Sequence, residues 1–325
     1  MRQGTNADID RLRLARLTLA ILLATLCINL LSAYIRHLEA GLGCEDWPGC
    51  YAQIGVHISE HSKGVARAAL APQPLAKQTH RGVATALVVM VLLLVHRSRR
   101  QRRATEALLP LAMAGLLLTL AVIGPASYLK TRPAIATANL LGGIALAALS
   151  WWLYLSLINT ARVNVTSWLR WLVRSSLALL LVQLALGAWL SANFAGLGCA
   201  GADGCEPGRG LIDAFWYLRE LVLDANGRVI ADQGTAAILV AHRIGATLVV
   251  PLLLLTAVLA ARVSMALRRN ALLVFALVSI QTTLGLCALA FSLPLAIVLA
   301  HSTVAALLLL AVLRLNHVAG GGASS

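Results

Sequence analysis

Long apolar runs dominate this sequence, and each has about the length that crosses a lipid bilayer as a helix. There are eight such runs, so the sequence predicts eight transmembrane helices. Only 12% of the residues are charged and 59% are hydrophobic, which leaves too few charges to cover a soluble globular protein. We therefore expect an all-α, polytopic membrane protein. The predicted spans are 17–35, 79–96, 107–127, 134–157, 172–192, 236–261, 271–291 and 294–314.

The charged residues predict how the chain is oriented in the membrane. Lys and Arg strongly outnumber Asp and Glu on the side that holds both termini, whereas the other side, which holds the long loops 36–78 and 193–235, is nearly balanced. Under the positive-inside rule, both termini are cytoplasmic and the long loops are extracytoplasmic. The net charge of +14 therefore reflects topology, and we expect no nucleic-acid partner.

The second half of the sequence repeats the first. AGLGC occurs at 40–44 and again at 195–199, and the Thr-His-Arg around His80 corresponds to the Ala-His-Arg around His242. The offset between these two histidines places Asn139 over His301. Internal repeats usually put related sites at equivalent positions, so we expect two tandem four-helix bundles. The predicted segments are a cytoplasmic N-terminus (1–16), a first half (17–157), a cytoplasmic linker (158–171), a second half (172–315) and a flexible C-terminal tail (316–325).

Two histidines in the second half are candidate iron ligands. His242 and His301 each begin a predicted span within an otherwise apolar stretch, where an ionisable group is costly and needs a function or a partner. Two neutral imidazoles that face each other across a helix bundle can hold a haem iron from both sides. The alternative is a pair of interfacial histidines bonded to carbonyl groups or water. Their duplicated positions favour haem ligation.

The first half offers a reduced version of this site. His80 is the equivalent of His242, but Asn139 stands where its partner histidine is expected, and an amide is a poor iron ligand. The first half could thus be an open haem site or a degenerate one that binds nothing. Arg81 and Arg243 each follow a histidine and suit a haem propionate, although snorkelling to the interface is the alternative.

The remaining histidines and one loop segment carry more ordinary predictions. The stretch LIDAFWYLRELV, residues 211–222, has apolar residues at helical spacing and predicts a short helix lying on the membrane surface. The other five histidines are expected to be solvated: His37, His57, His61, His96 and His317.

Four of the six cysteines lie in the two long loops. If those loops are extracytoplasmic, two structural disulfides are the favoured interpretation, Cys44–Cys50 and Cys199–Cys205. A metal site is the alternative, but neither loop has the Cys and His spacing of a zinc site. A redox role for Cys44 and Cys50 stays open.

Taken together, these motifs resemble the haem A synthase family over about residues 17 to 315. The most specific element is AGLGCEDWPGCY at 40–51. The order and spacing of six further motifs support it: THR (79–81), NLLGG (139–143), QLALG (183–187), AHR (241–243), QTTLG (281–285) and LPLAIVLAH (293–301).

This resemblance implies a membrane oxidoreductase that converts the C8 methyl group of haem O into the formyl group of haem A, for cytochrome oxidase. It implies that His242 and His301 hold the iron of a haem b and that His80 binds the substrate haem, haem O. It also matches the loop cysteines to the family's extracytoplasmic pairs. Expected partners are haem O synthase, cytochrome oxidase assembly factors and the lipid bilayer of a bacterial inner membrane, and self-association is open.

The departures from the family pattern all fall in the first half. Besides Asn139, Lys77 stands where the family tends to carry a glutamate, and the glutamine of the third span is missing around Ala114. Gln183 and Gln281 of the second half are present.

Two functions therefore stay open. The first is an active haem A synthase, which we favour because the first loop motif and His80 remain. The second is a non-catalytic, haem b-binding member that acts in electron transfer, haem handling or oxidase assembly. A transporter rests only on the repeat, and no charged residue lies in the middle of a span to mark a transport path.

Overall fold

The computed structural model describes residues 2–39, 72–99, 104–124, 131–198, 211–224, 229–230 and 232–320. In these ranges the chain is helical, apart from turns, extended connections and an isolated antiparallel bridge between Leu223 and Val229. The predicted all-α class is therefore confirmed. The helices are α1 (Arg2–Glu39), α3 (Pro72–Arg99), α4 (Ala104–Ile123), α5 (Pro133–Leu157), α6 (Ser167–Ala192), the 3-10 turn η3 (Ala195–Leu197), α7 (Leu211–Ala214), α8 (Gln233–Ala261), α9 (Met265–Ala290) and α10 (Leu295–Ala319).

Among the described residues, seven helices are long and apolar enough to cross a membrane. The third predicted span corresponds to α4, whose described apolar segment Leu108–Ile123 is shorter but packs between α3 and α5. Many large apolar side chains point outward and are exposed, as on a helix that is hydrophobic on all sides because lipid surrounds it. The prediction of a polytopic membrane protein is confirmed.

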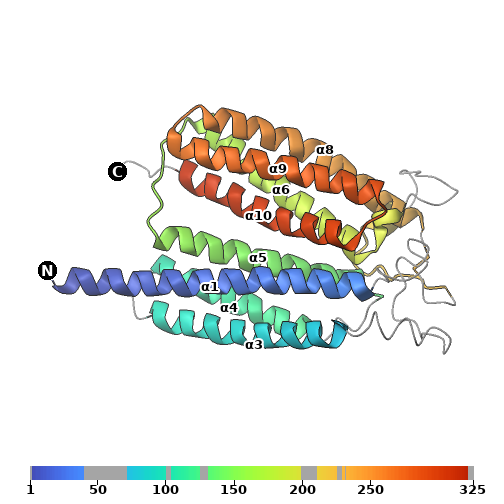
Figure 1. The fold of residues 1–325 in the computed structure, drawn as a ribbon, viewed down its shortest axis with the longest axis horizontal. Coiled ribbons are helices and arrows are strands. Elements are labelled where there is room, and N and C mark those ends of the chain that lie inside the picture. Colours follow the sequence, from blue (N-terminus) through green and yellow to red (C-terminus); the bar gives the residue numbers. More distant parts are fainter. Residues whose placement is uncertain are drawn as a thin grey trace.

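The helices form two rings of four that lie side by side (Figure 1). In the first ring α1 packs on α3, α3 on α4, α4 on α5, and α5 on α1. In the second ring α6, α8, α9 and α10 follow the same order. The rings meet where α5 packs on α6 and where α10 packs on α1. If the second ring repeats the first, α6 corresponds to α1 and α10 to α5, so these two contacts are equivalent. The described helices thus pack as two groups of four, as the predicted fold class requires.

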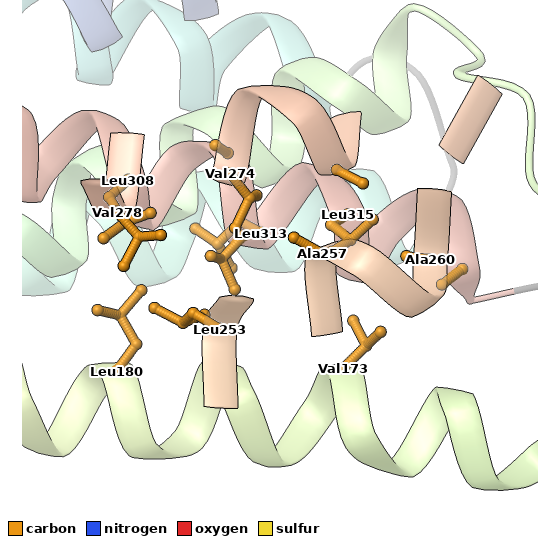
Figure 2. Packing of buried hydrophobic residues seen from close by; sticks show 14 of the residues in the cluster. Val173, Leu180, Leu253, Ala257, Ala260, Val274, Val278, Leu308, Leu313 and Leu315 are labelled. Carbon is orange, nitrogen blue, oxygen red and sulfur yellow. The ribbon is translucent and has the colours of Figure 1, made fainter. Parts of the chain in front are cut away.

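Each ring closes around its own apolar core. In the second ring, Leu180 of α6 meets Leu253 of α8 and Leu308 of α10 in one buried cluster (Figure 2). The first ring has a separate cluster that includes Leu94 and Met113. A smaller cluster of buried side chains from α1, α5 and α10 lies where the rings meet. Each half is therefore packed as a unit and positions its own polar residues.

The segment predicted to be a surface helix, residues 211–222, is mostly not helical. Only Leu211–Ala214 forms a helical turn, and the chain beyond it is in turn and extended conformation. A tertiary contact explains this, because the amide of Leu221 donates to the carbonyl of Thr131 at 2.8 Å and not to a carbonyl of its own segment. The prediction of a longer helix was wrong.

Ion pairs fasten the same segment to both halves. Arg132, at the N-cap of α5, forms a salt bridge with Glu220 in which Nη2 and Oε1 are 2.7 Å apart. Arg219 donates to both carboxylate oxygens of Asp232 at 2.7 Å and to Asn193 at 3.1 Å. Asp232 in turn caps the first turn of α8. This second-half loop therefore bridges the start of α5 and the start of α8.

The two ends of the bundle differ in charge. The start of α1, the α5–α6 linker and the end of α10 lie at the same end (Figure 1), which we name the basic end because most Lys and Arg residues are there. We name the opposite end, where α5, α8 and α10 begin, the loop end. At the basic end the amide of Val163 donates to the carbonyl of Val318 at 2.8 Å and ties the linker to α10.

Candidate functional site

The second ring carries two half-buried histidines in the loop-end turns of its helices. His242 lies on α8 and His301 lies on α10. Each imidazole contacts a neighbouring helix of the same ring, His242 through Gln183 of α6 and His301 through Gln281 of α9.

A glutamine from a neighbouring helix contacts each imidazole. Gln183 of α6 donates through Nε2 to the carbonyl of His242 at 3.0 Å, and the same nitrogen is 3.1 Å from His242 Nδ1. Gln281 of α9 places Nε2 at 2.9 Å from His301 Nε2. In each of these two imidazoles, one nitrogen contacts the glutamine and the other does not. For His301 the remaining atom, Nδ1, is buried without a hydrogen-bond partner among the described residues.

A glycine lies one turn beyond each glutamine on the same face of its helix. A Cβ added to Gly187 would lie 3.3 Å from His242 Cε1, and one added to Gly285 would lie 3.2 Å from His301 Cε1. Residues four apart are neighbours on a helix surface, so each helix turn presents an amide and a bare backbone to one imidazole. The second ring therefore contains the same arrangement twice, from α6 to α8 and from α9 to α10.

The first ring has a simpler version. His80 of α3 is half-buried, and its Nε2 lies 2.9 Å from the hydroxyl oxygen of Ser32 on α1. The offset that superposes the two AGLGC motifs places Ser32 over Gly187, so the same helix position contacts the histidine in both rings. Asn139 is half-buried on α5, at the position that His301 has on α10.

Buried polar atoms without partners mark the first ring as well. Asn29 Nδ2 on α1 and Thr137 Oγ1 on α5 are both buried and have no hydrogen-bond partner among the described residues. The Asn29 side chain lies against Gly143, where any Cβ would collide with its amide oxygen. Buried polar groups are normally satisfied, so these two atoms are exceptions on the helices that carry Ser32 and Asn139.

The other predicted residues divide into three groups. Arg81 and Arg243 are exposed on α3 and α8, and Lys77 is exposed three residues before His80. His96 is exposed, as predicted. The cysteine pairs Cys44–Cys50 and Cys199–Cys205, and also His57 and His61, lie outside the described residues.

Two histidines contradict the prediction that they are solvated. His37 belongs to the last turn of α1, and its Nε2 is buried without a partner among the described residues. His317 is only 3% exposed, because α10 extends past the predicted end of its span and packs there against Trp152 of α5. Both residues lie at the ends of predicted spans. Hydropathy alone does not show whether such a residue is buried, because that depends on how far the helix extends and which helices pack beside it.

The second-ring residues fit a haem held by two histidines. In the structure Gln183 Nε2 donates to His242 Nδ1 and Gln281 Nε2 donates to His301 Nε2, so the remaining nitrogen of each neutral imidazole carries the proton. Iron ligation requires the opposite amide orientation, in which the imidazole N–H donates to the glutamine Oε1 and the other nitrogen binds iron. Both glutamine Oε1 atoms are buried without a hydrogen-bond partner among the described residues, which fits that orientation. The absence of a Cβ at Gly187 and Gly285 lets each imidazole pack directly against the backbone of the neighbouring helix.

Comparison with known proteins now identifies the family. The model of a family described as cytochrome oxidase assembly protein, COX15-CtaA, matches residues 15–313. The heme A synthase of Shewanella oneidensis is 33% identical over 321 residues, which cover 94% of this chain and 95% of that relative. The chain belongs to the haem A synthase family. The likeness spans both rings, including the first ring, where this haem A synthase family member departs from the family pattern.

Sequence reasoning missed three residues of this haem A synthase family site. Ser32, Gly187 and Gly285 contact the histidines but carry no charge or metal-ligating group that would single them out. The repeated spacing of Gln183 with Gly187 and of Gln281 with Gly285 was a usable signal, because glutamine and glycine four residues apart share one helix face.

Proposed function

We propose that this chain is a haem A synthase-type oxidoreductase that converts the C8 methyl group of haem O into a formyl group. The observation that carries the proposal is the retained contact between His80 and Ser32, at the first-ring position equivalent to that of His242. A half that had lost its function would have no need to keep an ionisable group in an apolar bundle.

The second ring would hold a haem b between His242 and His301. When bound, this group supplies one-electron transfer near the substrate half. The residues of the chain fix its ligands: Gln183 and Gln281 restrict the rotation of the two imidazoles, and the glycines let the imidazoles pack closely against the helix backbone. Arg243 follows His242 and would pair with a propionate.

The first ring would bind the substrate haem O through His80. Ser32 holds the imidazole in place, and Arg81 would pair with a propionate. Asn139 leaves one side of the substrate without a histidine, which keeps that side open to a small co-reactant. With water as the oxygen source, the conversion is a four-electron oxidation in which the methyl group and one water molecule give the formyl group, four protons and four electrons. The electrons would leave towards the second ring, which packs directly beside this site.

Topology and partners complete the proposal. Both termini would be cytoplasmic and the cysteine loops extracytoplasmic, with Cys44–Cys50 and Cys199–Cys205 as disulfides in an oxidising compartment. Haem O must be delivered and haem A passed on, so a haem O synthase and cytochrome oxidase assembly factors are the proposed partners. A homo-oligomer is compatible with the exposed apolar outer faces.

The test is extraction and chromatography of the haems bound by the purified protein, expressed with a haem O synthase in a host that makes no haem A. We expect haem A or hydroxylated haem O from the wild-type chain and neither from His80→Ala. His96→Ala is the matched control, because His96 lies on the same helix but is exposed at the other end. Haem b as the sole haem in the wild-type protein would contradict the proposal.

A second candidate function follows from Asn139. If one histidine is not enough for turnover, the first ring binds no haem O, and the protein is a haem b-binding member that acts in electron transfer, haem handling or oxidase assembly. This candidate predicts that His80→Ala changes neither the visible spectrum nor the oxidase activity of the cell.

A further inference from the structure

A pocket of about 200 Å³ lies at the basic end, where the two rings meet. Trp152 of α5, Arg162 of the linker, Arg170 and Arg174 of α6 and His317 of α10 all line it. The pocket is far along the helices from His242, so it is separate from the site proposed above. Because both rings and their linker contribute, its shape depends on how the halves are joined.

The charge of this pocket is positive and is not compensated by nearby carboxylates. Arg162, Arg170 and Arg174 bring three guanidinium groups, and no Asp or Glu of the described residues is among those lining it. The first turn of α6 contains no acidic residue either, so the positive end of its helix dipole adds to the field. Such an arrangement attracts an anion.

Buried polar atoms separate this pocket from an ordinary solvated basic surface. His317 is 3% exposed, and its Nδ1 has no hydrogen-bond partner in the described part of the chain. The Nε of Arg170 is also buried without one there. His317 and Arg170 both line the cavity, and burying an unpaired polar group is costly, so these two residues favour a polar ligand there.

Two tryptophans place the pocket at the depth of lipid headgroups. Trp168 and Trp171, in the first turns of α6, are 55% and 66% exposed. Trp is enriched where a membrane protein crosses the boundary between lipid tails and headgroups. The guanidinium of Arg174 lies 5.6 Å from the centre of the Trp171 ring, so the basic cluster and the aromatic residues are at one level.

We propose that this pocket binds the phosphate group of an anionic phospholipid from the leaflet at the basic end. Arginine forks match phosphate oxygens, and basic pockets between transmembrane helices bind anionic headgroups in this way. The headgroup would join α6 of the second ring, α5 of the first ring and the linker between them. The lipid thereby stabilises the contact between the two halves.

The test measures the melting temperature of the full-length protein in vesicles of phosphatidylcholine, with and without phosphatidylglycerol. We expect phosphatidylglycerol to raise the melting temperature of the wild-type protein and to leave that of Arg162→Gln/Arg170→Gln/Arg174→Gln unchanged. The amount of phosphatidylglycerol that co-purifies with each chain, measured by mass spectrometry, should fall with each substitution. We expect each lost arginine to lower the apparent affinity for this lipid about fivefold, which corresponds to about 1 kcal/mol.

The matched control is Arg262→Gln/Arg268→Gln/Arg269→Gln. These arginines are exposed at the α8–α9 connection, at the same end of the bundle, and do not line the pocket. We expect this control to keep both the temperature shift and the bound lipid. Equal losses in both triple variants would show diffuse surface attraction and overturn the proposal, as would no loss in either.

A further arm distinguishes lipid from free phosphate. Inorganic phosphate is added to the protein in phosphatidylcholine vesicles at matched ionic strength. We expect it to give no more than a small part of the temperature shift, because it lacks acyl chains that anchor it in the leaflet. A full shift with phosphate alone, lost in the pocket variant, would overturn the assignment to a phospholipid. The single variant Arg162→Gln alters an exposed side chain and checks that any loss is not caused by misfolding.

Discussion

The two rings share one architecture and differ in the residues that face their interiors. In the second ring each of two histidines meets a glutamine and a glycine on a neighbouring helix, as His242 does with Gln183. In the first ring a single histidine, His80, meets the hydroxyl of Ser32, and Asn139 takes the other position. A duplicated scaffold can therefore keep its packing while the polar side chains inside the two copies diverge.

The largest expected effect comes from making the second ring like the first. His301→Asn should abolish haem bound by two histidines, because an amide ligates iron poorly and the second axial donor is lost. The reduced-minus-oxidised spectrum of the purified protein measures this. His96→Asn should leave the spectrum unchanged, since His96 is exposed at the other end of α3. An unaltered spectrum in His301→Asn would remove His301 from the ligand set.

The reverse exchange makes the first ring like the second. Asn139→His supplies the second imidazole that the family pattern has at this position, so we expect a first-ring haem with two histidine ligands and haem A formation that is kept or raised. The haem-to-protein ratio and the electron paramagnetic resonance spectrum report the ligands, and haem extraction reports the product. If no additional haem binds, features other than Asn139 distinguish the two rings, with Ser32 in place of a glycine as the next candidate.

A smaller effect should follow from adding a methyl group where an imidazole packs against a glycine. In Gly285→Ala the new Cβ would lie 3.2 Å from His301 Cε1, so the imidazole must move. We expect a cost of about 1 to 3 kcal/mol in the stability of the protein and a shifted haem spectrum. Gly115→Ala in α4 is the matched control, because nothing lies within 4 Å of its Cβ position. Similar behaviour of both variants would show that Gly285 has no special role.

The smallest effects belong to the loop that joins the rings. Arg132 and Glu220 are both more than half exposed, so Arg132→Gln should lower the free energy of unfolding by about 0 to 1 kcal/mol. Arg219 is 8% exposed and holds Asp232 with two hydrogen bonds, so Arg219→Gln should cost more, about 1 to 3 kcal/mol. Thermal unfolding in detergent compares them. A larger loss of stability for Arg132→Gln than for Arg219→Gln would mean that the salt bridge to the first ring contributes more than the one within the second half.

Much of this architecture could be predicted from the sequence, because lipid imposes strong patterns. Apolar runs locate helices, and the repeated AGLGC and His-Arg motifs reveal the two halves before any contact is known. The equivalence of Asn139 and His301 follows from that repeat alone. In each case the signal is local or is repeated within the chain.

The remainder depended on contacts between distant segments. Residues 211–222 have helical spacing, yet Leu221 bonds to Thr131 of the other half, and no local pattern records that partner. His317 looks like a solvated residue at the end of a span until α5 and the linker are seen to pack over it. Ser32 became visible only as the hydroxyl that meets His80.

The bridging loop also constrains how the protein is made. Arg132 at the start of α5 is bound by Glu220, which lies 88 residues further along the chain. Chains fold largely from the N-terminus as they are synthesised, so the first four helices are in the membrane before that partner exists. The entrance to α5 is therefore completed only after the following segment has crossed the bilayer.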